Sequence, residues 1–122
     1  MNQTFFFLGS LLGGLGVALG AFGAHGLRRR ISPERLETFE TGVRYQIYHA
    51  LALLAAALLA EWLPGARLAA AAGWLFLAGV ALFSGSLYLL VFTGQRRWGA
   101  VAPLGGLAFI AGWACLALAA VG

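Results

Sequence analysis

The chain has 122 residues, of which 61% are apolar and only 10% are charged, and its eight arginines and four glutamates leave a net charge of +4. An ordinary soluble domain carries about 25% charged residues, so this composition excludes a soluble globular domain, and it is too hydrophobic for a disordered chain. A single cysteine excludes a disulfide scaffold and any metal centre built from several cysteines. The composition is typical of one small integral membrane domain that covers residues 1–122.

Four stretches are long and apolar enough to cross a membrane, since a helix needs about 20 mainly apolar residues to span the hydrocarbon core. Lipid offers the backbone no hydrogen-bonding partners, so stretches of this length without period-two alternation are helices rather than strands. The predicted spans are about 5–27, 43–63, 68–92 and 99–121. We therefore expect an all-α fold, an integral membrane four-helix bundle.

The link between the first two spans carries its own helix signals. Ser32 is a good N-cap, Pro33 suits the first helical position, and Glu34 places an acid in the first turn. Leu36 and Phe39 follow at helical spacing. This pattern predicts a short amphipathic helix on the cytoplasmic membrane surface, between spans one and two. We favour a well-capped connector over a helix that binds a partner, because caps and charge runs are usually structural.

Arginine is distributed unevenly among the links. Five arginines lie within residues 28–44 and two lie at 96–97, whereas only Arg67 lies between the second and third spans. Because positively charged loops stay in the cytoplasm, this pattern predicts both termini outside and the two arginine-rich links inside. The basic links also favour anionic membrane lipid at the cytoplasmic face as a partner, rather than nucleic acid, because they adjoin membrane spans.

Glycine recurs along the first span at alternating spacings of four and three, which leaves one side of that helix almost without side chains. In the fourth span, small residues recur at the same alternating spacings. Close backbone approach supplies the packing energy between helices in lipid, so we favour a helix-packing seam over a glycine-lined conduit. Spans one and four pack either against each other or each against a neighbour. The seam glycines are Gly9, Gly13, Gly16, Gly20, Gly23, Gly105 and Gly112.

Polar side chains within the spans gather in the half nearest the arginine-rich links. One interpretation is a polar vestibule open to the cytoplasm, in which imidazoles carry protons or hold an anion beside Arg44. The other is that these groups hydrogen-bond one another and hold the helices together. Arg44 by itself is typical of a residue that snorkels at the membrane boundary. The candidate vestibule residues are His25, Arg44, Tyr45, Gln46, Tyr48, His49, Ser84, Ser86 and Tyr88.

Several chemistries lack the residues they need. Two histidines and one cysteine near the opposite face do not make a three-ligand zinc site. Ser84 lacks an acid with which His49 could complete a catalytic triad. We therefore expect no enzyme and no cofactor.

Four motifs, in order, resemble the signatures of one family of small membrane proteins. They are GAFGAHGL at 20–27, TGVRYQ at 41–46 followed by YHA at 48–50, FSGSLY at 83–88, and APLGG at 102–106. The family is the domain-of-unknown-function family 423, the UPF0382 membrane proteins, with bacterial members and a mitochondrial relative called transmembrane protein 256. The resemblance spans nearly the whole chain and implies a compact four-helix protein of the bacterial cytoplasmic (inner) membrane. It implies no established activity, substrate or cofactor.

Two functional hypotheses follow. The first is a non-enzymatic interaction or assembly partner in that membrane, acting as a homo-oligomer or with another protein. The second is a minimal transporter or channel with a cytoplasm-facing vestibule. A continuous wet cavity would favour transport, whereas a dry bundle with small residues facing lipid would favour assembly.

Overall fold

The computed structural model describes residues 2–122, and within them every regular element is helical. Residues 66–93 run on as one long helix, so the described part of the chain has four helices long and apolar enough to cross a membrane. The predicted all-α fold with four spans is confirmed. In chain order the elements are α1 (Gln3–His25), η1 (Leu27–Arg29), α2 (Pro33–Leu59), α3 (Ala66–Gly79), η2 (Val80–Ser84), α4 (Gly85–Thr93) and α5 (Arg97–Ala119).

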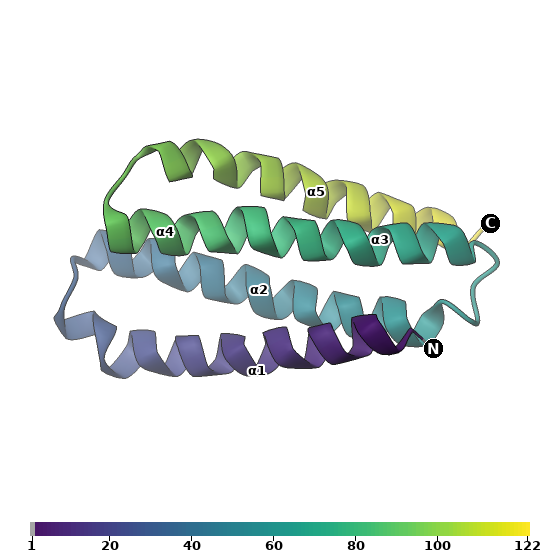
Figure 1. Cartoon of the computed structure of the whole chain (residues 1–122), viewed down its shortest axis with the longest axis horizontal. Coiled ribbons are helices and arrows are strands. Elements are labelled where there is room, and N and C mark those ends of the chain that lie inside the picture. The colour runs from purple at the N-terminus through teal and green to yellow at the C-terminus, as the bar shows by residue number, and fades with distance from the viewer. Residues whose placement is uncertain (1) are drawn as a thin grey trace.

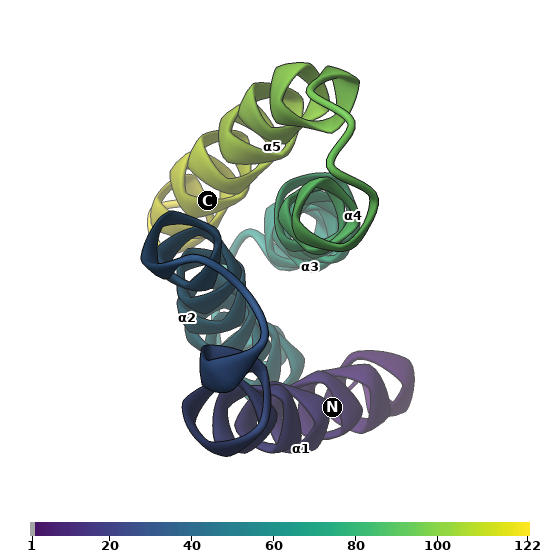
Figure 2. The same cartoon turned by 90° about the vertical axis from the view of Figure 1, so that its left-hand side faces the viewer.

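The four long helices run up and down, so both ends of the chain lie at the same end of the bundle (Figure 1). Seen end-on, they form an open arc rather than a closed square, with α1 and α5 far apart and α2 between them (Figure 2). Half of the most apolar window of α2 is buried, against 17% for the α1 span and 22% for α5. The helix α2 is thus the most enclosed of the four spans, and it packs against both α1 and the third helix.

The second helix differs from the prediction, because the expected short amphipathic helix does not form a separate element. Ser32 caps α2 as predicted, its Oγ accepting the backbone N–H of Arg35 at 3.2 Å, but the helix then continues without a break to Leu59. Phe39 in this first part is fully buried and its ring lies 5.9 Å from that of Phe92. Residues 33–42 are therefore the first turns of the second membrane helix, since tertiary packing holds them in line with it.

The third helix contains a π-helical turn, η2, that no sequence pattern predicts. It covers Val80–Ser84 and separates α3 from α4. A π-turn shifts the side chains that follow it around the helix, and such turns often occur at functional sites. Here it brings Ser84 to a fully buried position against α2.

The seam glycines of the first span lie on the side of α1 that faces α2. A Cβ atom on Gly9 would be 3.0 Å from Leu54 Cδ2, and one on Gly16 would be 2.6 Å from Ile47 Cγ1. Their missing side chains therefore let the two helices approach closely, as small residues do between membrane helices.

The glycines of the fourth span lie against the third helix instead. A Cβ on Gly112 would be 2.7 Å from Phe76 Cε1, and Gly105 faces Phe83. Spans one and four thus each pack against a neighbour. Three clusters of buried apolar residues lie between the helices, and the one shared by α2, the third helix and α5 is made of Ala52, Ala72, Phe76, Val80 and Phe109.

Candidate functional site: polar side chains within the bundle

His49 on α2 is the most constrained polar side chain of the bundle. It is only 5% exposed, its Nδ1 lies 2.8 Å from the carbonyl oxygen of Tyr45, and its Nε2 lies 3.0 Å from Nε1 of Trp113. A carbonyl only accepts and an indole N–H only donates. His49 therefore carries its proton on Nδ1 and accepts on Nε2, so the ring is neutral with both nitrogens engaged.

Aromatic rings surround this imidazole. The ring of Phe109 stacks on it at a centroid distance of 3.6 Å and an angle of 10°. Phe76 lies tilted at 5.5 Å, and the Tyr45 ring is nearly parallel at 6.2 Å. These contacts join α2, α3 and α5 around one histidine.

Gln46, one turn before His49, links α2 to two other helices. Its Nε2 donates to the carbonyl oxygen of Leu12 on α1 at 2.9 Å, and its Oε1 accepts the hydroxyl of Tyr88 on α4 at 2.7 Å. Gly16 of α1 lies beside this amide, since a Cβ there would be in ordinary contact with Gln46 Nε2 at 3.5 Å. Gln46 is only 3% exposed, so its amide is a buried group held by α1 and α4 together.

Ser84 joins the π-turn to α2. It is fully buried, and its Oγ donates to the carbonyl oxygen of Gly42 at 2.7 Å. Ser86 is also buried, but it donates to Leu82 within its own helical segment and so links no second helix.

The predicted vestibule residues do not all come together. Gln46, His49, Ser84 and Tyr88 take part in contacts between helices, as described above, and the Tyr45 ring lies 4.8 Å from that of Phe83 in the π-turn. His25, Arg44 and Tyr48 are exposed and lie outside this network. Arg44 instead donates to Thr41 Oγ1 at 3.1 Å on its own helix, as a boundary residue does.

Beside His49 lies a cavity of about 360 Å³ with mainly aromatic and aliphatic walls. His49 and Trp113 line it, but their polar atoms are already bonded to each other. The remaining polar side chain in its wall is Tyr45. The lining residues are Tyr45, His49, Phe83, Gly106, Phe109, Ile110 and Trp113.

Sequence reasoning missed the two residues of α5 that hold His49, which are Phe109 and Trp113. Their spacing of four places them on one helix face. A tryptophan in the middle of a span also carries a donor that needs an acceptor when buried, and this was the available signal.

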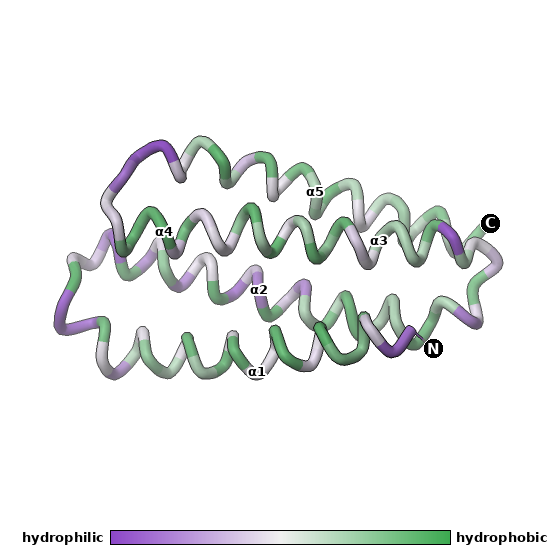
Figure 3. The backbone as a smooth tube through the Cα atoms, in the orientation of Figure 1, coloured by the Kyte–Doolittle hydropathy of each residue, from purple (hydrophilic) through white to green (hydrophobic). Residues whose placement is uncertain are grey.

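Hydrophilic residues also gather at the end of the bundle away from the chain termini (Figure 3). Figure 3 shows them at the two turns opposite the chain termini and along the first half of α2. The arginines at 28–30 lie in the first of these turns, and those at 96–97 lie in the second.

Comparison with known proteins places the chain among small membrane proteins. The family described as "Protein of unknown function (DUF423)" matches residues 19–106. The UPF0382 membrane protein YwdK of Bacillus subtilis is 49% identical over 119 residues, covering 98% of this chain and 97% of that protein. The UPF0382 inner membrane protein YgdD of Escherichia coli K12 is 42% identical over 108 residues, covering 86% and 79%.

No solved structure matches the chain. The four membrane-length helices and the relatives agree on a multi-pass membrane protein. The chain belongs to the DUF423 family, whose UPF0382 members are membrane proteins.

Proposed function

We propose that the protein is a non-enzymatic assembly or interaction partner in the cytoplasmic membrane. The observation that carries the proposal is a second face of small residues on α1, opposite its glycine seam. Ser10, Gly14, Ala18 and Ala21 recur there at spacings of four, four and three, and all four are exposed. A Cβ on Gly14 would meet no atom within 4 Å.

This face is available to another helix because α1 lies at one end of the arc (Figure 2). Small residues at such spacings let membrane helices pack closely, and packing rather than hydrophobic burial drives association in lipid. The fold uses one small face of α1 against α2 and leaves the other unoccupied, which is what an assembly role requires.

The transporter alternative has weaker support. A passing ligand needs polar groups that are free to bind it, and the polar atoms of His49 and Gln46 are already engaged with Trp113, Tyr88 and backbone carbonyls. The network instead suits the role of holding the helices in register.

The orientation we propose follows from charge. The two turns with most of the arginines lie at the end of the bundle away from the chain termini (Figure 1). Because positive turns are retained in the cytoplasm, this end faces inward and both termini face outward.

Photocrosslinking in living cells tests the assembly role. A photoreactive amino acid in place of Gly14 should crosslink to a second copy of the chain or to another membrane protein. The matched control replaces Ala114, an exposed small residue on α5. Crosslinks to lipid alone at position 14, or equal protein crosslinks at both positions, would contradict the proposal.

A second variant, Gly14→Leu, measures the same face in bilayers. Leucine should fit the open space without disturbing the fold but should keep a partner helix at a distance. Energy transfer between labelled copies, or yield of the crosslinked partner, should fall for Gly14→Leu and stay unchanged for Ala114→Leu. An equal response of the two variants would count against a role for α1.

A further inference from the structure

We propose that the gap between the start of α2 and the turn from α4 to α5 binds a phosphate group between Arg35 and Arg96, and that its occupant is the headgroup of an anionic phospholipid. The inference takes from the proposed function only the orientation that places this end at the cytoplasmic leaflet. It does not depend on the assembly role.

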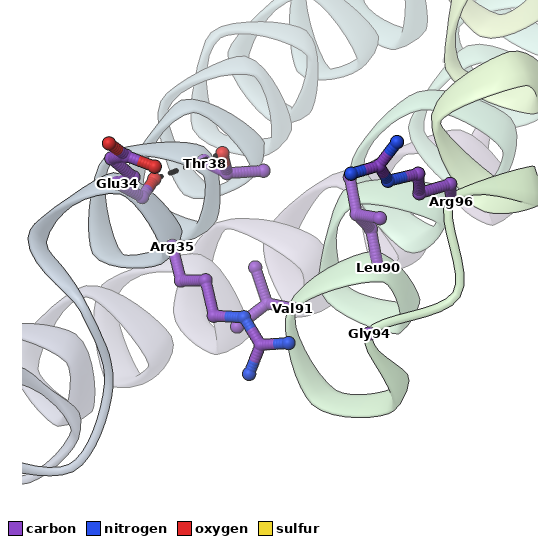
Figure 4. Close-up of a pocket in the computed structure, with 7 residues that line it drawn as sticks. All are labelled: Glu34, Arg35, Thr38, Leu90, Val91, Gly94 and Arg96. Atoms are coloured by element: carbon purple, nitrogen blue, oxygen red, sulfur yellow. Dashed lines mark hydrogen bonds between the residues drawn. The ribbon is translucent and has the colours of Figure 1, made fainter.

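The gap is a cavity of about 330 Å³ that the fold closes from two sides (Figure 4). The first turns of α2 form one wall, and the end of α4 with the following turn forms the other. The lining residues are Glu34, Arg35, Thr38, Leu90, Val91, Gly94 and Arg96.

Gly94 sets the position of the first guanidinium. It ends α4 in the left-handed conformation, with φ +70°, which glycine adopts without strain. A Cβ there would lie 2.9 Å from Arg35 Nη2, so the guanidinium sits directly against the backbone of the turn. Figure 4 shows the Arg35 side chain reaching past Val91 toward Gly94.

The charges of the two arginines are not neutralised within the described part of the chain, where the Arg35 and Arg96 side chains form neither ion pairs nor hydrogen bonds. Glu34 lies at the edge of the gap away from Arg96 (Figure 4). Among the other arginines, Arg44 donates to Thr41 Oγ1 and Arg97 lies over the Trp98 ring, whereas those at 28–30 and 67 are exposed on the surface. The lining thus has two guanidinium groups against one carboxylate.

Guanidinium groups recognise phosphate by paired, charge-assisted hydrogen bonds. A free phosphate and a lipid headgroup share this chemistry, but the apolar part of the cavity favours the lipid. Leu90 and the nearly fully buried Val91 line it beside the charges. A charged rim over an apolar wall at the end of a membrane helix matches the boundary between headgroup and acyl chain.

Nanodiscs that contain phosphatidylcholine and phosphatidylglycerol provide the test, with native mass spectrometry counting the lipids retained by the whole protein. The test pair is Arg35→Gln with Arg96→Gln. The control pair, Arg29→Gln with Arg30→Gln, removes two exposed charges from the same end of the bundle. Nanodiscs expose both faces, so the result is independent of the orientation and of the assembly role.

We expect the chain to retain phosphatidylglycerol in preference to phosphatidylcholine. The test pair should weaken that preference about tenfold, as the loss of charge-assisted hydrogen bonds predicts, whereas the control pair should change it less than about twofold. Arg35→Lys with Arg96→Lys should keep part of the preference for phosphatidylglycerol, because lysine retains the positive charge but lacks the paired N–H donors of a guanidinium group. Thermal unfolding of this lysine variant in detergent verifies that its fold is intact.

Equal weakening by the test and control pairs would overturn the proposal, because it would show general attraction to the basic end. A second arm titrates inorganic phosphate into phosphatidylcholine nanodiscs. Phosphate binding that depends on Arg35 and Arg96, without any preference for phosphatidylglycerol, would overturn the lipid as the occupant. Absence of binding in both arms would overturn the site itself.

Discussion

Trp113 donates its indole N–H to Nε2 of His49 over 3.0 Å, which joins α5 to α2 across 64 positions of sequence. This bond satisfies the hydrogen-bonding needs of both side chains. The indole N–H can only donate, and Nε2 of His49 is the acceptor nitrogen because Nδ1 donates to the Tyr45 carbonyl oxygen. Phe109, one turn before Trp113, stacks on the same imidazole. One helix face of α5 thus holds one side chain of α2.

Trp113→Phe tests the energetic value of this hydrogen bond. Interhelical hydrogen bonds in membranes average about 0.6 kcal/mol, with a maximum near 1.7, so we expect a loss of about 1 kcal/mol in the free energy of unfolding. Titration with a denaturing detergent, followed by circular dichroism, measures it. Trp74→Phe is the control, because Trp74 is about as exposed as Trp113, at 58% against 47%, but its indole forms no hydrogen bond to the described residues. A similar loss in both variants would mean that tryptophan volume matters and the bond does not.

His49→Ala should disturb the bundle more than Cys115→Ala. The first removes a stacked ring and two hydrogen bonds from a buried site and should cost at least about 2 kcal/mol, as other large-to-small core substitutions do. Cys115 is only half-buried at the edge of the hydrophobic core, so its loss should cost under about 1 kcal/mol. Thermal unfolding in detergent compares them, and equal shifts would show that the histidine has no special place.

Gly16→Leu and Gly14→Leu separate the two faces of α1. Gly16 lies against Ile47, so leucine there should push α1 from α2 and cost about 1–3 kcal/mol through overpacking. Gly14 faces open space, and its variant should unfold like the wild type in dilute detergent. Were Gly14→Leu the more destabilised of the two, α1 would be rotated relative to the arrangement described.

Cysteine labelling tests the orientation. In a Cys115→Ala background, Arg29→Cys and Arg96→Cys should resist a membrane-impermeant thiol reagent in intact cells and react after the cells are opened. Gly122→Cys, at the other end of the bundle, should react in both cases. Labelling of either arginine position from outside would reverse the proposed topology.

Much of the architecture could be predicted because it depends on local properties. The length and hydropathy of each stretch are sufficient to predict four membrane helices, and Ser32 followed by Pro33 marked the start of α2. The hydropathy pattern nevertheless placed the second span at residue 43. Hydropathy reports only whether the side chains of one segment favour lipid or water. The burial of Phe39 against Phe92 of the third helix is a tertiary contact, and it extends the helix back to Pro33.

The candidate site was predictable only in part. Gln46, His49 and Ser84 stood out as polar residues in apolar stretches, because polar groups in lipid need partners. Their partners could not be read from the chain: Leu12 offers a backbone carbonyl, and Trp113 resembled any lipid-facing aromatic residue.

The sequence by itself determined how many helices cross the membrane, where small residues permit close approach, and which buried groups must find hydrogen bonds. Only the tertiary structure decided that α1 packs on α2 and α5 on the third helix, and that His49 meets Trp113. The physical reason is that pairing depends on the rotation and register of helices far apart in the chain. The rotation and register of each helix are set by the sum of all its contacts with the others, and no single segment of the sequence specifies that sum.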